Sequence, residues 1–343
     1  MTELPLVVLT NRVFPETRAA LEHVARVVAN EQSEPWSYDQ VIERCREAAG
    51  LMAFMTDCID RPFLEQCPNL KVIGAALKGY DNIDVDAASE RGIQVTIVPD
   101  LLTEPTAELA VGLMIALGRH IPAGDAGIRK SGFAGWRPQL YGTGISSSTV
   151  GIVGFGRVGR AIARLLSGFG CRIVAFDAEP FESSGIEAMA FDDVLKLADI
   201  VVLGLPLTEA TTGLIDAEAI GWMRRGALLI NPARGSLVDE AAVADALESG
   251  HLGGYAADVF ECEDWARPGR PTAIDARLTG AGARTVLTPH IGSAVTAVRR
   301  EIELSAATSI IEALAGKVAG GAINGPALKT RIPAEVPALT KKK

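Results

Sequence analysis

An apolar run of strand length that leads into three closely spaced glycines is the feature that most constrains the fold of this chain. The segment TVGIVGFGRVGRAIARLLSGFGCRIVAFDAEP (149–180) reads as a strand, a glycine turn, an apolar helix and a second strand that ends at Asp177. Gly154, Gly156 and Gly159 have the spacing GxGxxG, which lets backbone approach a pyrophosphate closely. The helix that follows would offer free N–H groups and the positive end of its dipole. The segment therefore predicts a dinucleotide-binding βαβ unit.

The acid at the end of the second strand indicates which dinucleotide binds. Asp177 lies 18 positions after Gly159, where a carboxylate accepts hydrogen bonds from the adenosine ribose diol. This carboxylate would repel a 2′-phosphate, and the next residue, Ala178, brings no compensating cation. We therefore expect NAD rather than NADP. Arg157 either touches the pyrophosphate or lies in solvent at the helix start, and a glycine turn without a ligand is the alternative interpretation of the motif.

Apolar runs of strand length alternate with segments of helical period along the chain. Before residue 100 the strand candidates are LPLVVLT, GLMAFM, KVIGAAL and QVTIVP, and a helix is expected at TRAALEHVARVV. After the glycine turn the candidates are ADIVVLGLPL, GALLINPARG, GGYAADVF and RTVLTPHIG. This alternation is typical of βαβ units and parallel sheets. Since the chain has 343 residues, its length favours about two domains of an α/β protein.

Charge, cysteine usage and hydropathy limit the partners and the compartment. A net charge of −9 argues against nucleic acid or an anionic membrane as the main partner. Five cysteines without a CxxC pair favour the reducing cytoplasm, with thiols that pack rather than bind metal. The stretch LAVGLMIALG (109–118) is too short to span a bilayer and predicts a buried helix. We expect a cytoplasmic protein without a metal site, with a mobile tail at 326–343.

The helix expected after residue 102 has a clear start signal. Thr103 is a candidate N-cap, and Glu104 and Pro105 suit the first turn, where a negative charge and a missing N–H are both tolerated. The helix that follows is apolar nearly all round, so something must cover it. It is either a plain core helix, an interdomain helix or an oligomer contact.

Three charged or titratable side chains follow three of the strand candidates. Arg234 follows ALLIN, Glu263 follows YAADVF, and His290 follows VLTP. In a doubly wound parallel sheet all three lie beyond the carboxyl ends of strands, where such folds bind ligands. A carboxylate beside a histidine holds one tautomer and makes the ring more basic, and an arginine presents a planar fork to an oxyanion. We therefore expect an anionic substrate that loses a hydride to NAD while His290 takes a proton.

Each member of this set has an alternative interpretation, which for His290 is a core imidazole. Arg234 could be a surface residue of the NPARGSLVDE turn. Glu263 lies within the acidic run Glu261-Cys262-Glu263-Asp264, so a neighbouring carboxylate could be the one that matters.

Two further cations could belong to the same site. Lys78 directly follows the apolar strand candidate KVIGAAL, and Arg299 lies on the expected C-terminal helix. With Arg234 they would surround a compact anion that has several oxygens. Alternatively, Lys78 is a solvated strand end, and Arg299 shares a solvated helix face with Arg300.

At these motifs the chain resembles the D-2-hydroxyacid dehydrogenase superfamily. The resemblance covers residues 5–325 and includes DNIDVDAASERGI, GFGRVGR, NPARGSLVDEAAVADALESG, GGYAADVFE and TPHIGS. It implies two Rossmann-like domains that close by a hinge, with a substrate-binding domain of residues 1–100 and 291–325 and an NAD-binding domain of residues 101–290. It also implies a homodimer built on the NAD-binding domains, and catalysis by Arg234, Glu263 and His290. The cofactor-binding residues that it implies are Gly154, Gly156, Arg157, Val158, Gly159, Asp177, Thr106, Leu205, Pro206, Pro232, Ala233, Arg234, Asp258, His290 and Gly292.

Several stretches depart from the general family pattern and are similar to its phosphite dehydrogenase branch. They are ALKGYDNID, MAFM, GWRPQLYGTG, EDWARPGRPT and HIGSAVTAVRREIE. The similarity implies oxidation of phosphite to phosphate, where ordinary members act on 2-hydroxy acids or 2-keto acids such as glyoxylate and hydroxypyruvate. The substrate-binding residues that it implies are Lys78, Arg234, His290, Met55, Gly79, Arg299, Ser293, Trp136, Tyr141 and Trp265. For Met55 and the three aromatic residues, packing is an equal alternative to covering a small dry site.

Two observations qualify the resemblance. The cofactor loop reads Asp177-Ala178 where Glu-Ala is expected, and the shorter acid keeps the preference for NAD. A non-catalytic NAD-sensing protein on the same fold is a further alternative, but the Arg/Glu/His set is intact.

Overall fold

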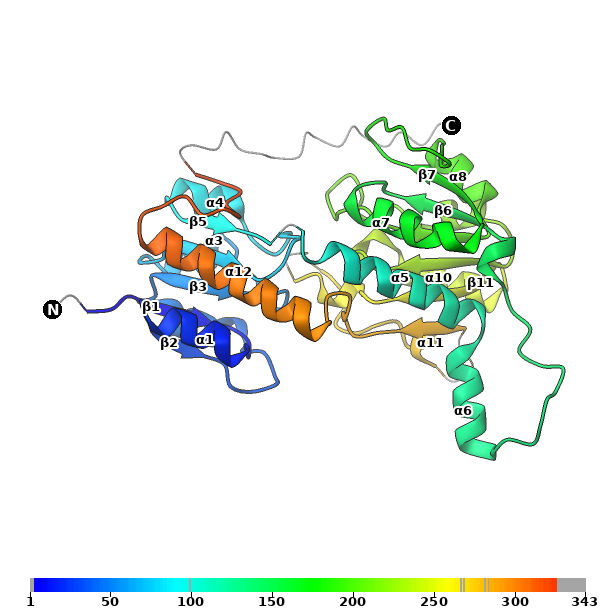
Figure 1. Ribbon diagram of the computed structural model, residues 1–343, viewed down its shortest axis with the longest axis horizontal. Coiled ribbons are helices and arrows are strands. Elements are labelled where there is room, and N and C mark those ends of the chain that lie inside the picture. Colours follow the sequence, from blue (N-terminus) through cyan, green and yellow to red (C-terminus); the bar gives the residue numbers. More distant parts are fainter. Residues whose placement is uncertain are drawn as a thin grey trace. The chain divides into compact units, whose positions relative to one another are not determined.

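The computed structural model describes residues 3–98, 100–265, 267, 269–280, 282 and 284–325 (Figure 1). These residues form two compact units, each with its own sheet. Among the described residues, unit 1 consists of those within 3–102 and 293–325, together with 265 and 267, and unit 2 consists of those within 103–264 and 269–292. The tail expected at 326–343 lies outside the described residues.

Unit 1 is a five-stranded parallel sheet in the order β2-β1-β3-β4-β5. Its first strand lies inside the sheet, so the chain winds to both sides of it, as in flavodoxin-like folds. The strands are β1 (Leu6–Leu9), β2 (Arg26–Ala29), β3 (Gly50–Ala53), β4 (Val72–Ala75) and β5 (Gln94–Thr96). The helices are α1 (Pro15–Glu22), α2 (Tyr38–Cys45), α3 (Arg61–Gln66), α4 (Val85–Glu90) and α12 (Thr296–Leu314).

Helices cover both faces of this sheet, which explains its nearly continuous apolar strands. One core cluster joins the sheet to α2, α3 and α4 through residues such as Phe63 and Ala87. The other joins it to α1 and α12 through Leu21 and Ile310. The helix expected over TRAALEHVARVV is partly wrong, because α1 ends at Glu22 and Arg26–Ala29 pairs with β1 as an edge strand. The β-branched Val27 and Val28 favour that conformation.

A buried carboxylate fixes the loop that follows β3. Asp57 is 5% exposed, and its Oδ2 accepts hydrogen bonds from Thr10 Oγ1 at 2.6 Å and from the backbone N–H of Phe54 at 2.7 Å. Asn82 donates to the carbonyls of Phe54 and Asp57 at 3.1 and 2.7 Å. The loop that carries Met55 is therefore held from two neighbouring strand ends.

Asp57 makes the stability of unit 1 depend on pH. Burial raises the pKa of Asp57 from 3.8 to about 6. Between these values the folded chain binds more protons than the unfolded chain, so the free energy of unfolding falls as the pH rises through this window. We compare the free energy of unfolding of Asp57→Asn with that of the parent. The variant should gain on the order of 3 kcal/mol relative to the parent when the pH rises from 4 to 7. Urea unfolding at both pH values measures this, with Glu43→Gln as an exposed control. A difference between D57N and the parent that does not change with pH would contradict the expectation.

Unit 2 is a seven-stranded parallel sheet in the order β12-β11-β10-β9-β6-β7-β8. Its first strand, β6, lies between β7 and β9, so the chain reverses direction across the sheet at β6, as in doubly wound dinucleotide-binding folds. The strands are β6 (Thr149–Val153), β7 (Arg172–Phe176), β8 (Glu187–Ala188), β9 (Ile200–Leu203), β10 (Ala227–Asn231), β11 (Leu252–Ala257) and β12 (Thr285–Leu287). The helices are α5 (Thr103–Gly118), α6 (Ile121–Ser131), α7 (Arg157–Leu166), α8 (Phe191–Leu197), α9 (Ala217–Trp222), α10 (Glu240–Glu248) and α11 (Ala276–Thr279).

Helix α5 is part of the core of unit 2. It packs against α7 and the sheet, and Ala107, Leu113 and Leu117 are buried in the shared cluster. Thr103 is the first residue of the helix, and its Oγ1 is buried without a hydrogen-bond partner among the described residues. The expectation that Thr103 caps the helix is therefore wrong. None of the helices in the described ranges is both long and apolar enough to cross a membrane.

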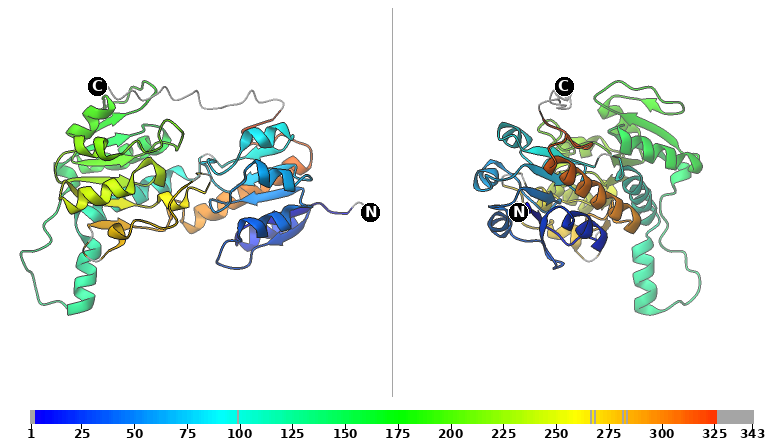
Figure 2. Two further views of the ribbon diagram at one scale, coloured as in Figure 1. Left: turned by 180° about the vertical axis from the view of Figure 1, so that it is seen from behind. Right: turned by 60° about the vertical axis from the view of Figure 1, so that its left-hand side comes forward.

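Helix α6 and the segment after it stand away from the sheet of unit 2 (Figure 2). None of the residues of α6 is buried, and its Ile121 and Ile128 are more than half exposed. The segment that follows exposes Phe133, Trp136 and Tyr141. An exposed apolar surface of this kind is typical of a contact with another chain.

Candidate active site

The glycine turn after β6 has the shape that a pyrophosphate needs. Gly154 has φ 95°, and a Cβ atom there would lie 2.7 Å from the backbone of Gly204 and Leu205 at the end of β9. A Cβ atom at Gly159 would lie 2.2 Å from the Gly154 carbonyl oxygen. Helix α7 begins directly after Gly156, which has no side chain, so its first N–H groups face outward from a bare turn. The residues present therefore fit a dinucleotide.

Asp177 follows β7 and lies next to this turn. Its Oδ2 accepts from the N–H of Phe155 at 2.6 Å, and its Oδ1 accepts from the N–H of Glu179 at 3.0 Å. The two backbone donors hold the carboxylate in one orientation and leave further lone pairs for a ribose diol. Arg157 is the exposed first residue of α7, and Val158 packs partly against the core below.

The histidine and the glutamate predicted from the sequence are in contact. His290 Nδ1 lies 2.8 Å from Glu263 Oε2, and the other oxygen, Oε1, accepts from the N–H of Phe260 at 2.9 Å. His290 has φ 53°, and its N–H donates to the carbonyl of Asp258 at 2.8 Å. Because a carboxylate only accepts, Nδ1 carries the proton and Nε2 is the nitrogen left to exchange a proton with a substrate.

Asp258 anchors the segment on which His290 lies. Its carboxylate is 1% exposed and accepts from Thr288 Oγ1 at 2.6 Å and from the N–H groups of Ile291 and Gly292 at 2.8 and 2.7 Å. Burial raises the pKa of Asp258, and these three donors oppose the rise. Asp258 and Gly292, both expected near the cofactor, thus meet within one turn.

Arg234 lies on the turn after β10, next to the turn that carries Glu263. Asn231 Nδ2 donates to the carbonyl of Arg234 at 2.8 Å, and its Oδ1 accepts from the N–H of Ala233 at 3.1 Å. A Cβ atom at Gly235 would lie 1.9 Å from the backbone of Phe260, so the two turns are in direct contact. Because β10, β11 and β12 are neighbours, Arg234, Glu263 and His290 are at one edge of the unit 2 sheet.

The structure also distinguishes the members of the acidic run after β11. Glu263 bonds to His290, Glu261 Oε1 accepts from the N–H of Glu240 at 3.0 Å, and Asp264 Oδ2 accepts from the N–H of Ser236 at 2.7 Å. Only Glu263, among these described acids, is bonded to the imidazole. The sequence could not separate the three, because they differ only in the partners that the fold gives them.

In unit 1, Arg299 is largely buried rather than on a solvated helix face. Its side chain is 18% exposed, its Nη1 lies 3.4 Å from the carbonyl oxygen of Ala76, and its Nη2 lies 3.8 Å from Glu303 Oε1. The guanidinium also lies 5.8 Å from the ring centre of Phe54. Burial lowers the pKa of Arg299. The Arg299 cation is therefore held at the carboxyl end of β4, against Ala76. Ala76 lies two positions before Lys78 in the chain.

The other substrate-binding candidates of unit 1 are distributed as follows. Lys78 and Gly79 are half-buried, Met55 packs partly against the core, and Ser293 is buried with its Oγ 3.5 Å from Arg299 Nη1. Trp265 is 40% exposed.

The two aromatic residues after α6 are separate from the charged set of unit 2. Trp136 and Tyr141 are 77% and 76% exposed. Both side chains are thus exposed on unit 2 of a single chain, and their role in covering a small dry site stays a prediction. They lie on the projecting segment of Figure 2, which the sequence alone gave no way to place.

Comparison with known proteins assigns the family. The family model described as D-isomer specific 2-hydroxyacid dehydrogenase, NAD binding domain, matches residues 111–292. The chain belongs to this family. It therefore has a domain that binds NAD, and NAD supplies the hydride acceptor when bound. Within the described residues we find no group of three His, Cys, Asp or Glu side chains that could hold a metal ion.

Several relatives of this dehydrogenase family cover most of the chain. The glyoxylate reductase of Aeropyrum pernix is 34% identical over 96% of this chain and 98% of its own length. The D-3-phosphoglycerate dehydrogenase of Mycobacterium tuberculosis is 36% identical over 94% of this chain, but the chain spans only 59% of that relative's length. A crystal structure of a protein from Thermus thermophilus has a TM-score of 0.85 and 33% identity, and it covers 93% of this chain and 100% of its own.

Proposed function

We propose that this chain catalyses NAD-dependent hydride transfer to and from a small, compact anion, with Arg234, Glu263 and His290 as the catalytic residues. The observation that carries the proposal is the 2.8 Å contact between His290 Nδ1 and Glu263 Oε2. It holds the proton on Nδ1 and leaves Nε2 as a general acid and base.

The first candidate substrate is a 2-hydroxy acid and its 2-oxo product, with glyoxylate or hydroxypyruvate as the compact examples. Relatives named glyoxylate reductase match over nearly their whole length and favour this candidate over any other. In this reaction Arg234 would hold the carboxylate of the substrate through its planar fork. His290 would take the hydroxyl proton as the C–H hydride leaves, and would return it in the reverse direction.

The second candidate substrate is phosphite. The specific observation that favours it is the buried guanidinium of Arg299 at the end of β4, the strand that Lys78 follows in the chain. A phosphite dianion has three oxygens to neutralise and no side chain to accommodate, so it suits more than one cation. The oxygen of a water would form a bond to phosphorus as the P–H hydride leaves, and His290 would accept the proton of that water.

Lys78→Ala tests whether the cation after β4 belongs to the site. A charge-assisted hydrogen bond contributes roughly 1.5–3 kcal/mol, so its loss should raise the KM for a compact anion about 10-fold or more. The Kd of NAD should stay within about twofold. Steady-state kinetics give the KM, and Lys71→Ala, an exposed lysine just before β4, is the matched control. An unchanged KM would mean that Lys78 is only a solvated strand end.

A two-arm assay distinguishes the candidates. One arm measures NADH formation with phosphite, and the other measures NADH consumption with glyoxylate, hydroxypyruvate and pyruvate. Turnover only with the 2-oxo acids selects the first candidate, and turnover only with phosphite selects the second. No turnover in either arm would contradict the proposal.

We also propose that the protein is a homodimer built on the NAD-binding domain and that it works in the cytoplasm. The exposed apolar residues on and after α6 support the dimer. The five cysteines, none of which forms a disulfide, support a reducing compartment. Analytical ultracentrifugation tests the dimer, and a monomer at micromolar concentration would overturn that part.

A further inference from the structure

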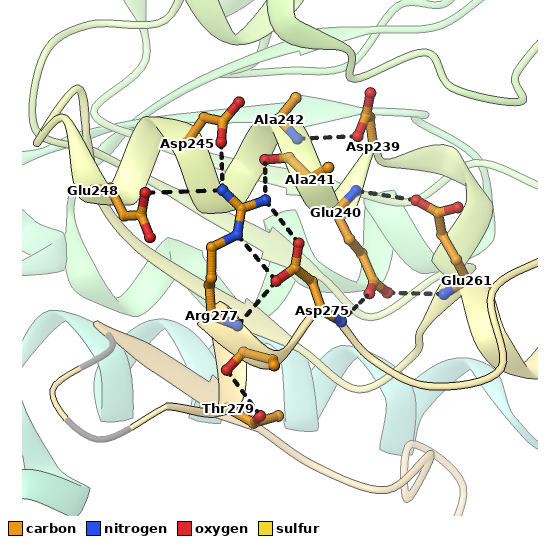
Figure 3. Close-up of polar contacts among 11 residues, drawn as sticks. Asp239, Glu240, Ala241, Ala242, Asp245, Glu248, Glu261, Asp275, Arg277 and Thr279 are labelled. Atoms are coloured by element: carbon orange, nitrogen blue, oxygen red, sulfur yellow. Dashed lines mark hydrogen bonds and ion pairs between the residues drawn. The ribbon is translucent and has the colours of Figure 1, made fainter.

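A pair of carboxylates joins the first turn of α10 to the short 3-10 helix η4 (Glu261–Glu263) that carries the catalytic glutamate. Glu240 Oε1 accepts from the N–H of Glu261 at 2.8 Å, and Glu261 Oε1 accepts from the N–H of Glu240 at 3.0 Å (Figure 3). Each acid therefore binds the backbone of the other. Glu240 is 4% exposed, and its Oε2 also accepts from the N–H of Asp275 at 3.4 Å.

A buried carboxylate in this setting needs a reason. Glu240 faces two further acids, Glu261 and Asp275, and lies near Cys262 and the buried ring of Tyr255. Burial raises the pKa of Glu240, with the neighbouring acids adding to the rise and the backbone donors opposing it. Burying a carboxylate here costs free energy. The structural role of Glu240 is therefore to accept the two hydrogen bonds from the N–H groups of Glu261 and Asp275.

We propose that Glu240 is a positioning residue for the reaction: it fixes the backbone of η4 so that Glu263 stays in place beside His290. This inference rests on the proposed function. Glu261, whose N–H binds Glu240, begins the single turn that ends at Glu263. The orientation of Glu263 depends on that turn, because its Oε1 accepts from the N–H of Phe260 while its Oε2 meets His290.

The rest of α10 is well placed to act as a rigid support. Its N-cap, Asp239, accepts from the N–H of Ala242 at 3.0 Å. Arg277 bonds to Asp275 and also pairs with Asp245 on the same helix, so the segment that donates to Glu240 is held as well. Figure 3 shows the contacts that run from Arg277 through Asp275 and Glu240 to Glu261 as one continuous set, with the Asp239–Ala242 contact as a separate pair.

The test compares Glu240→Ala with Glu240→Gln. Alanine removes both the charge and the acceptor, whereas glutamine removes the charge and keeps an oxygen for the N–H of Glu261. We expect E240A to lower kcat about tenfold with an unchanged Kd for NAD, as for a catalytic group displaced by a fraction of an ångström. E240Q should retain most of the kcat.

The second readout does not require turnover. The proton NMR signal of His290 Nδ1–H, assigned by His290→Asn among only four histidines, reports the hydrogen bond to Glu263 Oε2 directly. We expect E240A to shift this signal upfield or to broaden it, because a displaced Glu263 accepts a longer and weaker hydrogen bond. E240Q should leave it near the parent position.

Asp192→Asn is the control, because it removes a carboxylate from another helix of unit 2, α8, that pairs with Lys196 instead of with the backbone of η4. It should change neither kcat nor the Nδ1–H signal of His290. Equal changes of this signal in E240A and E240Q would show a charge effect and overturn the proposal, as would a parent-like signal and kcat in E240A. If the parent protein turns over no substrate, the proposed function fails, yet the NMR signal still decides whether Glu240 positions Glu263.

Discussion

His290→Asn is expected to lower kcat by about 10²–10⁴-fold, the usual contribution of a positioned general acid and base. The asparagine amide can still donate to Glu263 Oε2, 2.8 Å from Nδ1 in the parent. It has no counterpart of Nε2, so the proton of the substrate has no acceptor. Steady-state kinetics at saturating NAD measure the loss.

Two controls separate this loss from a general disturbance of unit 2. The Kd of NAD should be unchanged, because none of the described contacts joins the His290 imidazole to the glycine turn after β6. His23→Gln, at the exposed C-cap of α1, should have the parent kcat. A kcat for H290N within about threefold of the parent would show that another group is the base.

Arg234→Lys is expected to reduce kcat/KM by roughly 10–100-fold, mainly through KM. Lysine keeps the charge but lacks the planar fork that matches an oxyanion. The turn itself should survive, because the Asn231 side chain that holds it bonds to backbone atoms of Ala233 and Arg234. Arg225→Lys, an exposed arginine at the opposite edge of the sheet just before β10, serves as control. A parent-like kcat/KM for R234K would place Arg234 on the surface of its turn and outside the site.

Local patterns were enough to predict most of the architecture. The strand candidates correspond to β1, β3–β5 and β9–β12, and the glycine motif runs from the end of β6 into the first turn of α7. Period and length identify such elements wherever apolar strands are buried on both faces. The edge strand β2 was missed because Val27 and Val28 also continued the helical period of α1. Thr103 was expected as the N-cap of α5 but is its first residue. The acid and the proline that follow it favour a helix start without fixing the exact position.

The partners of the site residues could not be predicted in the same way. The sequence indicated that a glutamate follows β11, but the choice among Glu261, Glu263 and Asp264 depended on contacts with residues 3 to 28 positions away. Similarly, Arg299 was ambiguous until its guanidinium was found against Ala76, 223 positions earlier. Long-range contacts of this kind leave no periodic signal.

Transfer of deuterium tests most directly whether a hydride passes between the substrate and NAD at this site. The purified protein would be given NAD in ordinary water with either glycolate deuterated at C2 or phosphite that carries a P–D bond. We expect the deuterium of one of the two substrates to appear on C4 of the nicotinamide, and H290N to reduce the rate of this transfer with NAD still bound. NADH formed without deuterium, or no reduction of NAD with either substrate, would contradict the proposed function.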